Sequence, residues 1–210
     1  ATAFSGKYEK GALSGSVSFT APTTTMGGST LGGSLTYTLC VDDKAELTST
    51  GTTTAGKTVT LPKQLDRGMH YLKVATQNTA GRSPWAYCYF WAGTDEVKAT
   101  DAIAIEDKNT VQVVWEAPTA GVHNGYYDPT DVKYVVTRQP DNVKVYEGTA
   151  TSCTDNTIGS LQYGFHYYEV VAVTGGYSGE AVKTDKLQLG TVASLPYEML
   201  FDSETECNSL

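Results

Sequence analysis

Apolar and polar residues alternate with a period of two along most of the chain. The alternation is clear in residues 16–20 (SVSFT), 35–41 (LTYTLCV), 111–115 (VQVVW) and 166–172 (HYYEVVA). A period of two gives a strand one buried and one solvated face, as in antiparallel sheets. Gly, Pro, Asp and Asn separate these segments, and no stretch of ten or more residues shows helical periodicity with caps. About seven short strands per ~96 residues predict a sandwich of two sheets.

The pattern occurs twice along the chain. The pairs Leu65/Leu161, Gly68/Gly164 and His70/His166 are each 96 residues apart, as are the segments VSFTAP and VVWEAP, which end at Pro22 and Pro118. This period is too long for a solenoid unit of roughly 20–50 residues and is the size of a small domain. The repeat predicts two tandem copies, module 1 (residues 1–95) and module 2 (residues 96–192), followed by a tail (residues 193–210).

Several positions of the repeat resemble the fibronectin type III pattern. They are the apolar strand Val111-x-Val113-x-Trp115 ending at Pro118, Tyr134 in the third strand, and Leu161-x-x-Gly164 before a tyrosine-containing strand. Module 1 has the same marks, with Phe19 in place of the tryptophan. The resemblance implies an all-β fold of two tandem immunoglobulin-like sandwiches. Their structural core would include Phe19, Tyr37, Leu65, Trp115, Tyr134 and Leu161.

The sixth strand departs from that pattern. Fibronectin domains usually place a tyrosine first in the inward set of this strand, as a tyrosine corner. With Lys73 and Glu169 facing outward, alternation here puts His70 and His166 first in the inward set. Either a one-residue bulge returns Tyr71 and Tyr167 to the corner, or the imidazoles replace the phenols.

Two further resemblances concern the source of the chain. The Gly-rich insertions at 27–34 and 122–131 look like variants found in bacterial surface proteins. The tail resembles the opening strand of jelly-roll, adhesin-like domains that follow fibronectin modules in such proteins. Together with the start at Ala1 rather than Met, these features predict a segment of a longer bacterial protein, located extracellularly or at the cell surface.

Composition argues against several classes of partner. The net charge is −8 without a cluster of Lys or Arg, so a nucleic-acid backbone is a poor partner. No apolar run approaches the roughly 18 residues that insert into a bilayer. The four cysteines lack C-x-x-C spacing. Cys40 and Cys88 fall on strands that flank a third strand, beyond the ~7 Å reach of a disulfide, which favours free thiols.

Residues that could carry chemistry are explained by turns. Asp42-Asp43 and Asp95-Glu96 are adjacent acids at predicted turns, whereas a glycosidase needs two carboxylates across a cleft. The loop with His123, Asn124, Asp128 and Asp131 was weighed as a metal site, but turn chemistry accounts for its Asn, Asp, Gly and Pro. No nucleophile motif is present. We therefore expect no enzyme, no cofactor and no metal.

One strand stands out: residues 84–92 read PWAYCYFWA. Trp85, Tyr87, Tyr89 and Trp91 share one face, and we call these four residues the aromatic stripe. In module 2 the equivalent positions are Lys186 and Gln188 on one face and Leu187 and Leu189 on the other, so the stripe is predicted to face outward. Module 2, the joining loop or a neighbouring strand could cover it. Otherwise it binds another domain or chain, including by edge-strand pairing, or it is a platform for sugar rings.

The join near 93–96 is short and has no Gly/Ser run, which predicts a semi-rigid rod rather than a flexible tether. The expected function is a non-catalytic spacer and adhesion or protein-interaction segment. Its expected partners are neighbouring domains of the same polypeptide, other surface proteins or polysaccharide. The alternative is a pair of carbohydrate-binding accessory modules of a polysaccharide-degrading enzyme.

Overall fold

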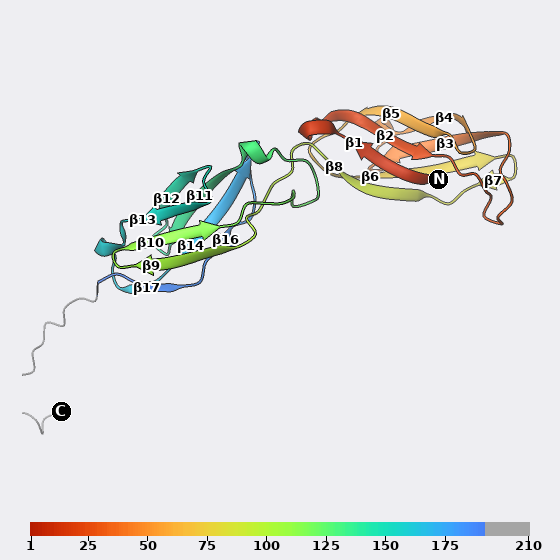
Figure 1. Cartoon of the computed structure of the whole chain (residues 1–210). Coiled ribbons are helices and arrows are strands. Elements are labelled where there is room, and N and C mark those ends of the chain that lie inside the picture. Colours follow the sequence, from red (N-terminus) through yellow and green to blue (C-terminus); the bar gives the residue numbers. More distant parts are fainter. Residues whose placement is uncertain (192–210) are drawn as a thin grey trace, which may run out of the picture.

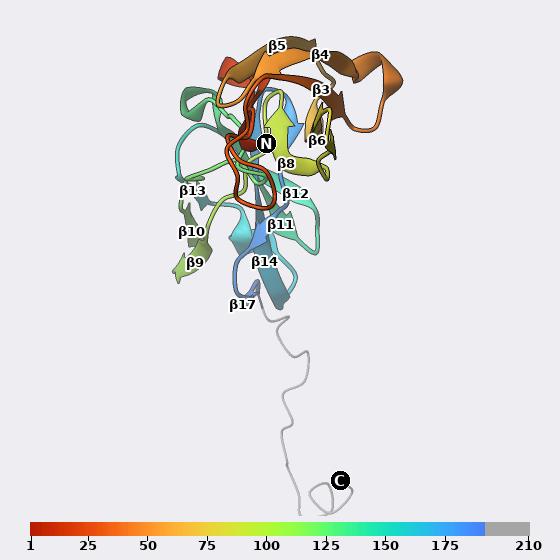
Figure 2. The same ribbon diagram turned by 90° about the vertical axis from the view of Figure 1, so that its right-hand side faces the viewer.

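The computed structural model describes residues 1–191, which form two β-sandwiches placed end to end (Figure 1). The expectations for the tail and for Cys207 lie outside the described residues. In a view turned by 90°, the strands of module 1 lie above most of those of module 2, and the two groups overlap in projection (Figure 2). The prediction of an all-β chain of two tandem immunoglobulin-like sandwiches is confirmed.

Module 1 packs a three-stranded sheet against a larger one. The first sheet has the order β1-β2-β5, formed by β1 (Thr2–Lys7), β2 (Ser14–Thr20) and β5 (Thr58–Gln64). The second contains β4 (Ser49–Thr54), β3 (Ser34–Val41) and β6 (Gly68–Asn78), with β7 (Gly81–Arg82) and β8 (Ala86–Ala92) both paired with β6. Short 3-10 turns are η1 (Glu9–Gly11) and η2 (Ala45–Leu47).

Module 2 repeats this order. Its smaller sheet is β13-β10-β9, formed by β9 (Ala102–Asp107), β10 (Thr110–Trp115) and β13 (Ser152–Asp155). The other contains β12 (Val143–Gly148), β11 (Lys133–Gln139) and β14 (Gly164–Thr174), with β15 (Tyr177–Ser178), β16 (Val182–Lys183) and β17 (Leu187–Leu189) on β14. The 3-10 turns are η3 (Pro129–Asp131) and η4 (Ile158–Ser160).

Each sandwich is built around the same aromatic pair. In module 1 the rings of Phe19 and Tyr37 meet edge to face, with centroids 5.3 Å apart. In module 2 Trp115 and Tyr134 do the same, also at 5.3 Å. All four side chains are buried. Because alternate residues of β2 and β10 face inward, each strand places one large ring in the middle of its core. There the ring contacts the tyrosine of the facing sheet.

The two cores are separate clusters of buried side chains. The core of module 1 runs from Tyr8 to Ala92 and includes buried Leu65, and that of module 2 runs from Val97 to Leu189. Leu161 is half-buried at the margin of the second cluster. Residues 93–96 thus join two bodies that do not share a core.

The imidazoles replace the phenols in the sixth strand of both modules. His70 and His166 are buried, and neither strand contains a bulge at this point. The Nε2–H of His70 donates to the carbonyl of Asp66 at 2.8 Å, and that of His166 to the carbonyl of Gln162 at 3.4 Å. Each ring therefore reaches back four residues along the backbone, the contact that a tyrosine corner makes with its hydroxyl.

Cys40, Cys88 and Cys153 are free thiols, as predicted. β6 separates the strands of Cys40 and Cys88. Burial raises the pKa of the Cys88 thiol, and burial followed by the nearby Asp155 charge raises that of Cys153 to about 11. Within residues 1–191 no helix has the length and apolar character needed to cross a bilayer.

Candidate contact surface and the joint between modules

The aromatic stripe lies on the outer face of β8, at one side of the larger sheet of module 1. Trp85, Tyr87 and Tyr89 are 39%, 64% and 67% exposed, whereas Trp91 is largely covered. Phe90, on the opposite face of the strand, packs against the core. Alternation along β8 therefore sends three rings of the stripe to solvent and the fourth to the boundary with module 2.

The exposed rings do not form a flat surface. Tyr87 and Tyr89 stand edge to face, with an interplanar angle of 78° and centroids 6.2 Å apart. The ring of Trp85 is contacted by two cations, the guanidinium of Arg82 at 4.3 Å and the ammonium of Lys73 at 4.8 Å. Cation–π contacts of this kind hold the indole in place. The rings of Tyr87 and Tyr89 are therefore not coplanar.

The acid pair Asp42-Asp43 supports this surface from its polar side. Asp42 accepts the Nδ1–H of His70 at 2.6 Å and the backbone N–H of Tyr71 at 3.0 Å. Asp43 accepts the hydroxyl of Tyr71 and pairs with Lys73. Tyr71 in turn lies 6.0 Å from Tyr89, ring centroid to centroid. Both carboxylates thus bind residues of β6, the strand that pairs with β8.

Trp91 belongs to the joint rather than to the exposed surface. Its indole stacks on the imidazole of His123 in module 2, with centroids 4.2 Å apart and 6° between the planes. Gly125 makes room for the ring, since a Cβ at this residue would lie 2.4 Å from the indole Cδ1 atom. Module 2 therefore covers Trp91, as one of the alternatives from the sequence expected, but it leaves Tyr87 and Tyr89 exposed.

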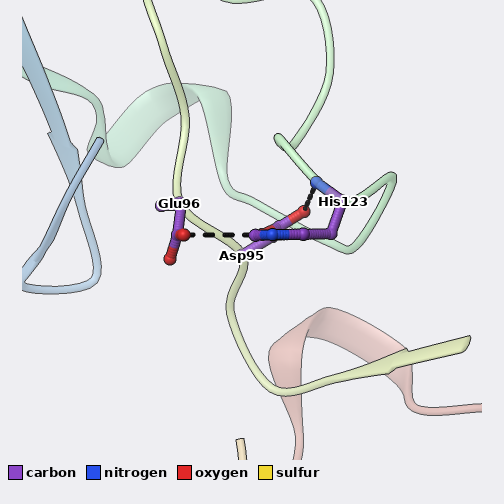
Figure 3. A group of neighbouring side chains, drawn as sticks. All are labelled: Asp95, Glu96 and His123. Carbon is purple, nitrogen blue, oxygen red and sulfur yellow. Dashed lines mark hydrogen bonds and ion pairs between the residues drawn. The ribbon is translucent and has the colours of Figure 1, made fainter. Parts of the chain in front are cut away.

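The carboxylate of Asp95 organises the loop that carries His123. Asp95 is completely buried, and its Oδ2 atom accepts the backbone N–H groups of His123 and Gly125 at 2.7 and 2.9 Å. Its Oδ1 atom accepts the Nδ1–H of His123 at 2.9 Å. Figure 3 shows the imidazole beside Asp95 and Glu96, which come from the segment joining the modules. One buried acid therefore fixes the loop of module 2 to the joining segment.

Arg67 closes the joint from the side of module 1. Its Nε–H donates to the carbonyl of Thr94 at 2.6 Å, and its Nη2 group pairs with Glu96. The guanidinium lies 3.7 Å from the ring centroid of Tyr177 in module 2 and 5.2 Å from that of Trp91. The arginine thus contacts module 1, the joining segment and module 2 at once.

Asp95, Glu96 and His123 have the residue types of a metal site, and their ligand atoms lie within 4.8 Å of one another. Their oxygens are already engaged, however. Asp95 accepts three hydrogen bonds, and the arginine side chain neutralises Glu96. The imidazole Nδ1 atom acts as a donor to Asp95 rather than as a lone pair for a cation. The cluster therefore has a structural role: it holds the His123 loop of module 2 to the joining segment and to Arg67.

The loop residues weighed from the sequence as a metal site are not brought together. Asp128 caps the turn that follows it, accepting the N–H of Thr130 at 2.9 Å. Asp131 accepts the N–H of Gly175 at 2.8 Å, in the next loop. His123 is used in the joint, as described above. A turn therefore accounts for Asp128, and a contact with the loop between β14 and β15 accounts for Asp131.

Sequence reasoning missed the residues that make the joint. Arg67, Asp95 and Tyr177 lie far apart in the chain; the sequence placed Asp95 at a turn and gave no role to Arg67 or Tyr177. The short join without a Gly/Ser run was the one available signal, because such a segment holds two modules close enough to touch. It did not indicate which side chains would meet.

No protein-family model matches the chain, and no curated protein sequence matches it. Among solved structures, a two-domain fibronectin type III segment of chicken tenascin is similar over 89% of this chain and 97% of its own length, at 10% identity and a TM-score of 0.36. The FN1–FN3 domains of chicken CNTN1 are similar over 89% of this chain, at 12% identity and a TM-score of 0.35. This chain covers 62% of that structure.

Proposed function

We propose that this chain is a non-catalytic segment of an extracellular bacterial protein that spaces neighbouring domains and binds a protein partner through the aromatic stripe. The observation that carries the proposal is that the four rings of the stripe lie in two different environments. One ring, Trp91, is used to hold module 2 in place, and three rings remain exposed on a face of fixed orientation. A spacer needs the first feature and an adhesion module needs the second.

The size of the exposed surface sets the strength of the contact. The exposed parts of Trp85, Tyr87 and Tyr89 amount to roughly 350 Å², given 150–250 Å² for each aromatic side chain. Burying that area contributes about 9 kcal/mol at ~25 cal/mol per Å². Association itself costs about 4–15 kcal/mol. The stripe alone therefore supports a weak contact, and a tight one needs further residues from the partner.

Carbohydrate binding is the second candidate. Tyr87 and Tyr89 are the most exposed rings of the stripe, and such rings can stack on the CH faces of sugars. The 78° angle between them and the cations on Trp85 work against a planar platform. A protein partner, whose side chains can fill an uneven surface, fits this geometry better.

A photo-cross-linking residue at Tyr87, placed in the full-length protein in the cell that produces it, tests the proposal. We expect covalent adducts with a defined protein at Tyr87 and none at Thr52, an exposed control position on β4 at the opposite side of the same sheet. Equal labelling at both positions, or none at either, would remove the protein-contact function.

A glycan array with the purified segment tests the second candidate. Under the protein-contact proposal, the wild type and the Trp85→Ala and Tyr87→Ala variants give the same background signal. A glycan signal that disappears in both variants would replace the proposal with carbohydrate binding.

A further inference from the structure

A hollow of about 480 Å³ lies at the end of module 1 that points away from module 2. It is bordered by β7, by the loop that follows β2 and by the segment before β8 (Figure 1). Its lining includes the apolar residues Pro22, Met26, Leu31, Pro84 and Trp85. Concave spaces of about 300–1,000 Å³ with apolar linings are typical of binding sites.

The corresponding place in module 2 is filled by an aromatic ring of the chain itself. Counted from Pro22 and Pro118, Leu31 and Tyr127 hold the same position in the loop, 96 residues apart. The ring of Tyr127 packs against the core of module 2, and its hydroxyl donates to the carbonyl of Pro118 at 2.9 Å. Pro118 is buried, whereas Pro22 is half-buried. A leucine in place of the tyrosine thus leaves this end of module 1 open.

The same end of module 2 also receives an aromatic side chain from outside the module. The loop 121–127 contains Gly125, which makes room for Trp91 of module 1. The matching loop of module 1 contains Gly28, Gly32 and Gly33, and no atom lies within 4 Å of a Cβ built at any of them. The loop of module 1 is therefore open to a ring from outside, as the loop of module 2 is to Trp91.

A cation without an acidic partner borders the hollow. Arg82 is one of the lining residues, and its guanidinium lies 4.3 Å from the ring centroid of Trp85. None of the salt bridges within residues 1–191 involves Arg82, whereas Lys73, the other cation on this indole, pairs with Asp43. A guanidinium beside an apolar hollow favours a carboxylate supplied by a partner.

We propose that the hollow binds an aromatic side chain of the partner protein, next to an acidic residue that pairs with Arg82. This inference rests on the protein-contact function proposed above and names the chemistry of its partner. Trp85 belongs both to the hollow and to the aromatic stripe, so one partner segment can cover both. Aromatic anchors that fill a pocket dominate the binding free energy of many interfaces. The hollow supplies the further contact that the exposed rings of the stripe need.

Titration with short peptides tests the chemistry of the site. The probe is acetyl-Glu-Phe-amide, and its controls are acetyl-Glu-Ala-amide and acetyl-Lys-Phe-amide. We expect the probe to shift the ¹⁵N–¹H signals of Leu31 and Ala80, which line the hollow, with a dissociation constant of about 1 mM. Both controls should bind at least about tenfold more weakly. Equal binding of the probe and either control, or no shift at these two residues, would overturn the proposal.

Substitutions separate the ring from the charge. Leu31→Tyr places in module 1 the ring that module 2 has at this point, and it should abolish binding of the probe. Ala80→Phe, at an exposed lining residue, fills the hollow in a second way should Leu31→Tyr fail to fold. Arg82→Gln should remove the preference for the acidic peptide over the basic one, and Lys133→Gln, at an exposed cation of module 2, should leave it unchanged. Undiminished binding in a folded Leu31→Tyr or Ala80→Phe variant would overturn the proposal.

Cross-linking in the full-length protein distinguishes this inference from the contact function. A photo-cross-linking residue at Met26, which lines the hollow and is 88% exposed, is expected to capture the same protein as one at Tyr87. The captured peptide should contain an aromatic residue beside Asp or Glu. Adducts at Tyr87 with none at Met26, or a captured peptide without an aromatic residue, would overturn the role of the hollow while leaving the contact function intact. Adducts at neither position would remove both.

Discussion

The indole of Trp91 lies parallel to the imidazole of His123, 4.2 Å away, across the boundary between the two modules. The contact joins the last strand of module 1 to a loop of module 2, and the buried carboxylate of Asp95 holds that loop in place. This stacked pair and this acid, together with Arg67, make the contacts of the joint. Both can be removed without touching either core.

Asp95→Ala is expected to uncouple the two modules. The change leaves the N–H groups of His123 and Gly125, in a partly buried loop, without their acceptor, and it removes the partner of the imidazole. Each unpaired donor costs at most about 1–3 kcal/mol, the value for a fully buried group. We expect ¹⁵N relaxation to give the two modules different rotational correlation times, whereas in the wild type they tumble together. Unchanged relaxation in the variant would show that the acid does not hold the joint.

Gly125→Ala is expected to displace Trp91 from its stack. The new Cβ would lie 2.4 Å from the indole, a distance that requires the ring or the loop to move. Tryptophan fluorescence of the variant should become more accessible to iodide quenching. Gly159→Ala is the matched control in module 2, because no atom lies within 4 Å of its Cβ position. Equal quenching in the two variants would contradict the predicted clash.

The core of module 2 contains a buried ion pair at a place where module 1 is apolar. Arg138 and Tyr168 are paired across β11 and β14, as Val41 and Leu72 are across β3 and β6. Asp155 accepts from the guanidinium at 2.6 Å and from the tyrosine hydroxyl at 2.9 Å. Asp141 also accepts from the guanidinium, at 2.7 Å, so Asp155→Ala does not leave the cation unpaired. The change leaves the buried hydroxyl of Tyr168 without its acceptor and should destabilise module 2 by about 1–3 kcal/mol.

Chemical denaturation followed by NMR signals from each module measures this loss. The signals of module 1 serve as the internal control, since its core does not include the ion pair. A loss of stability shared equally by the modules would mean that they unfold as one unit.

The same acid makes the stability of module 2 depend on pH. Burial raises the pKa of Asp155, but hydrogen bonds from Thr157, Tyr168 and Arg138 outweigh burial, so the pKa is lowered on balance. The charged form is therefore favoured by folding. Its contribution to the free energy of unfolding is complete above the ordinary pKa of 3.8 and is lost as the pH falls through the lowered value.

Urea denaturation of the wild type and of Asp155→Asn between pH 6 and pH 3 checks this sign. The free energies of unfolding should differ most at pH 6 and converge as the acid becomes protonated. A difference between the two proteins that grows as the pH falls would contradict the assignment.

Much of the fold follows from local pattern. Phe19 and Trp115 could be placed in the cores because alternation fixes which face of a strand is buried, and the repeat confirmed the choice at two positions. Alternation cannot show what approaches the other face. The four rings of the stripe looked equivalent in the sequence, yet Trp91 is covered because the loop of His123 comes against it.

The joint and the break between β16 and β17 escaped prediction for a related reason. Arg67 contacts Tyr177 through a fold that brings together loops more than a hundred positions apart. The break at Thr184 depends on a hydroxyl that replaces a backbone acceptor, and a threonine in the sequence VKTDKL gives no sign of this. These side-chain contacts form between residues that are distant in the sequence. They therefore do not appear in the alternation of apolar and polar residues.

The divided last strand of module 2 shields one edge of its larger sheet. Because β16 and β17 are short and separated, this side of the second sandwich lacks the uninterrupted run of seven residues found in β8. A continuous strand at this edge would present an unbroken row of backbone groups, on which another chain could add a strand. The hydroxyl of Thr184, which accepts the backbone N–H of Tyr168, thus helps to protect this side of module 2.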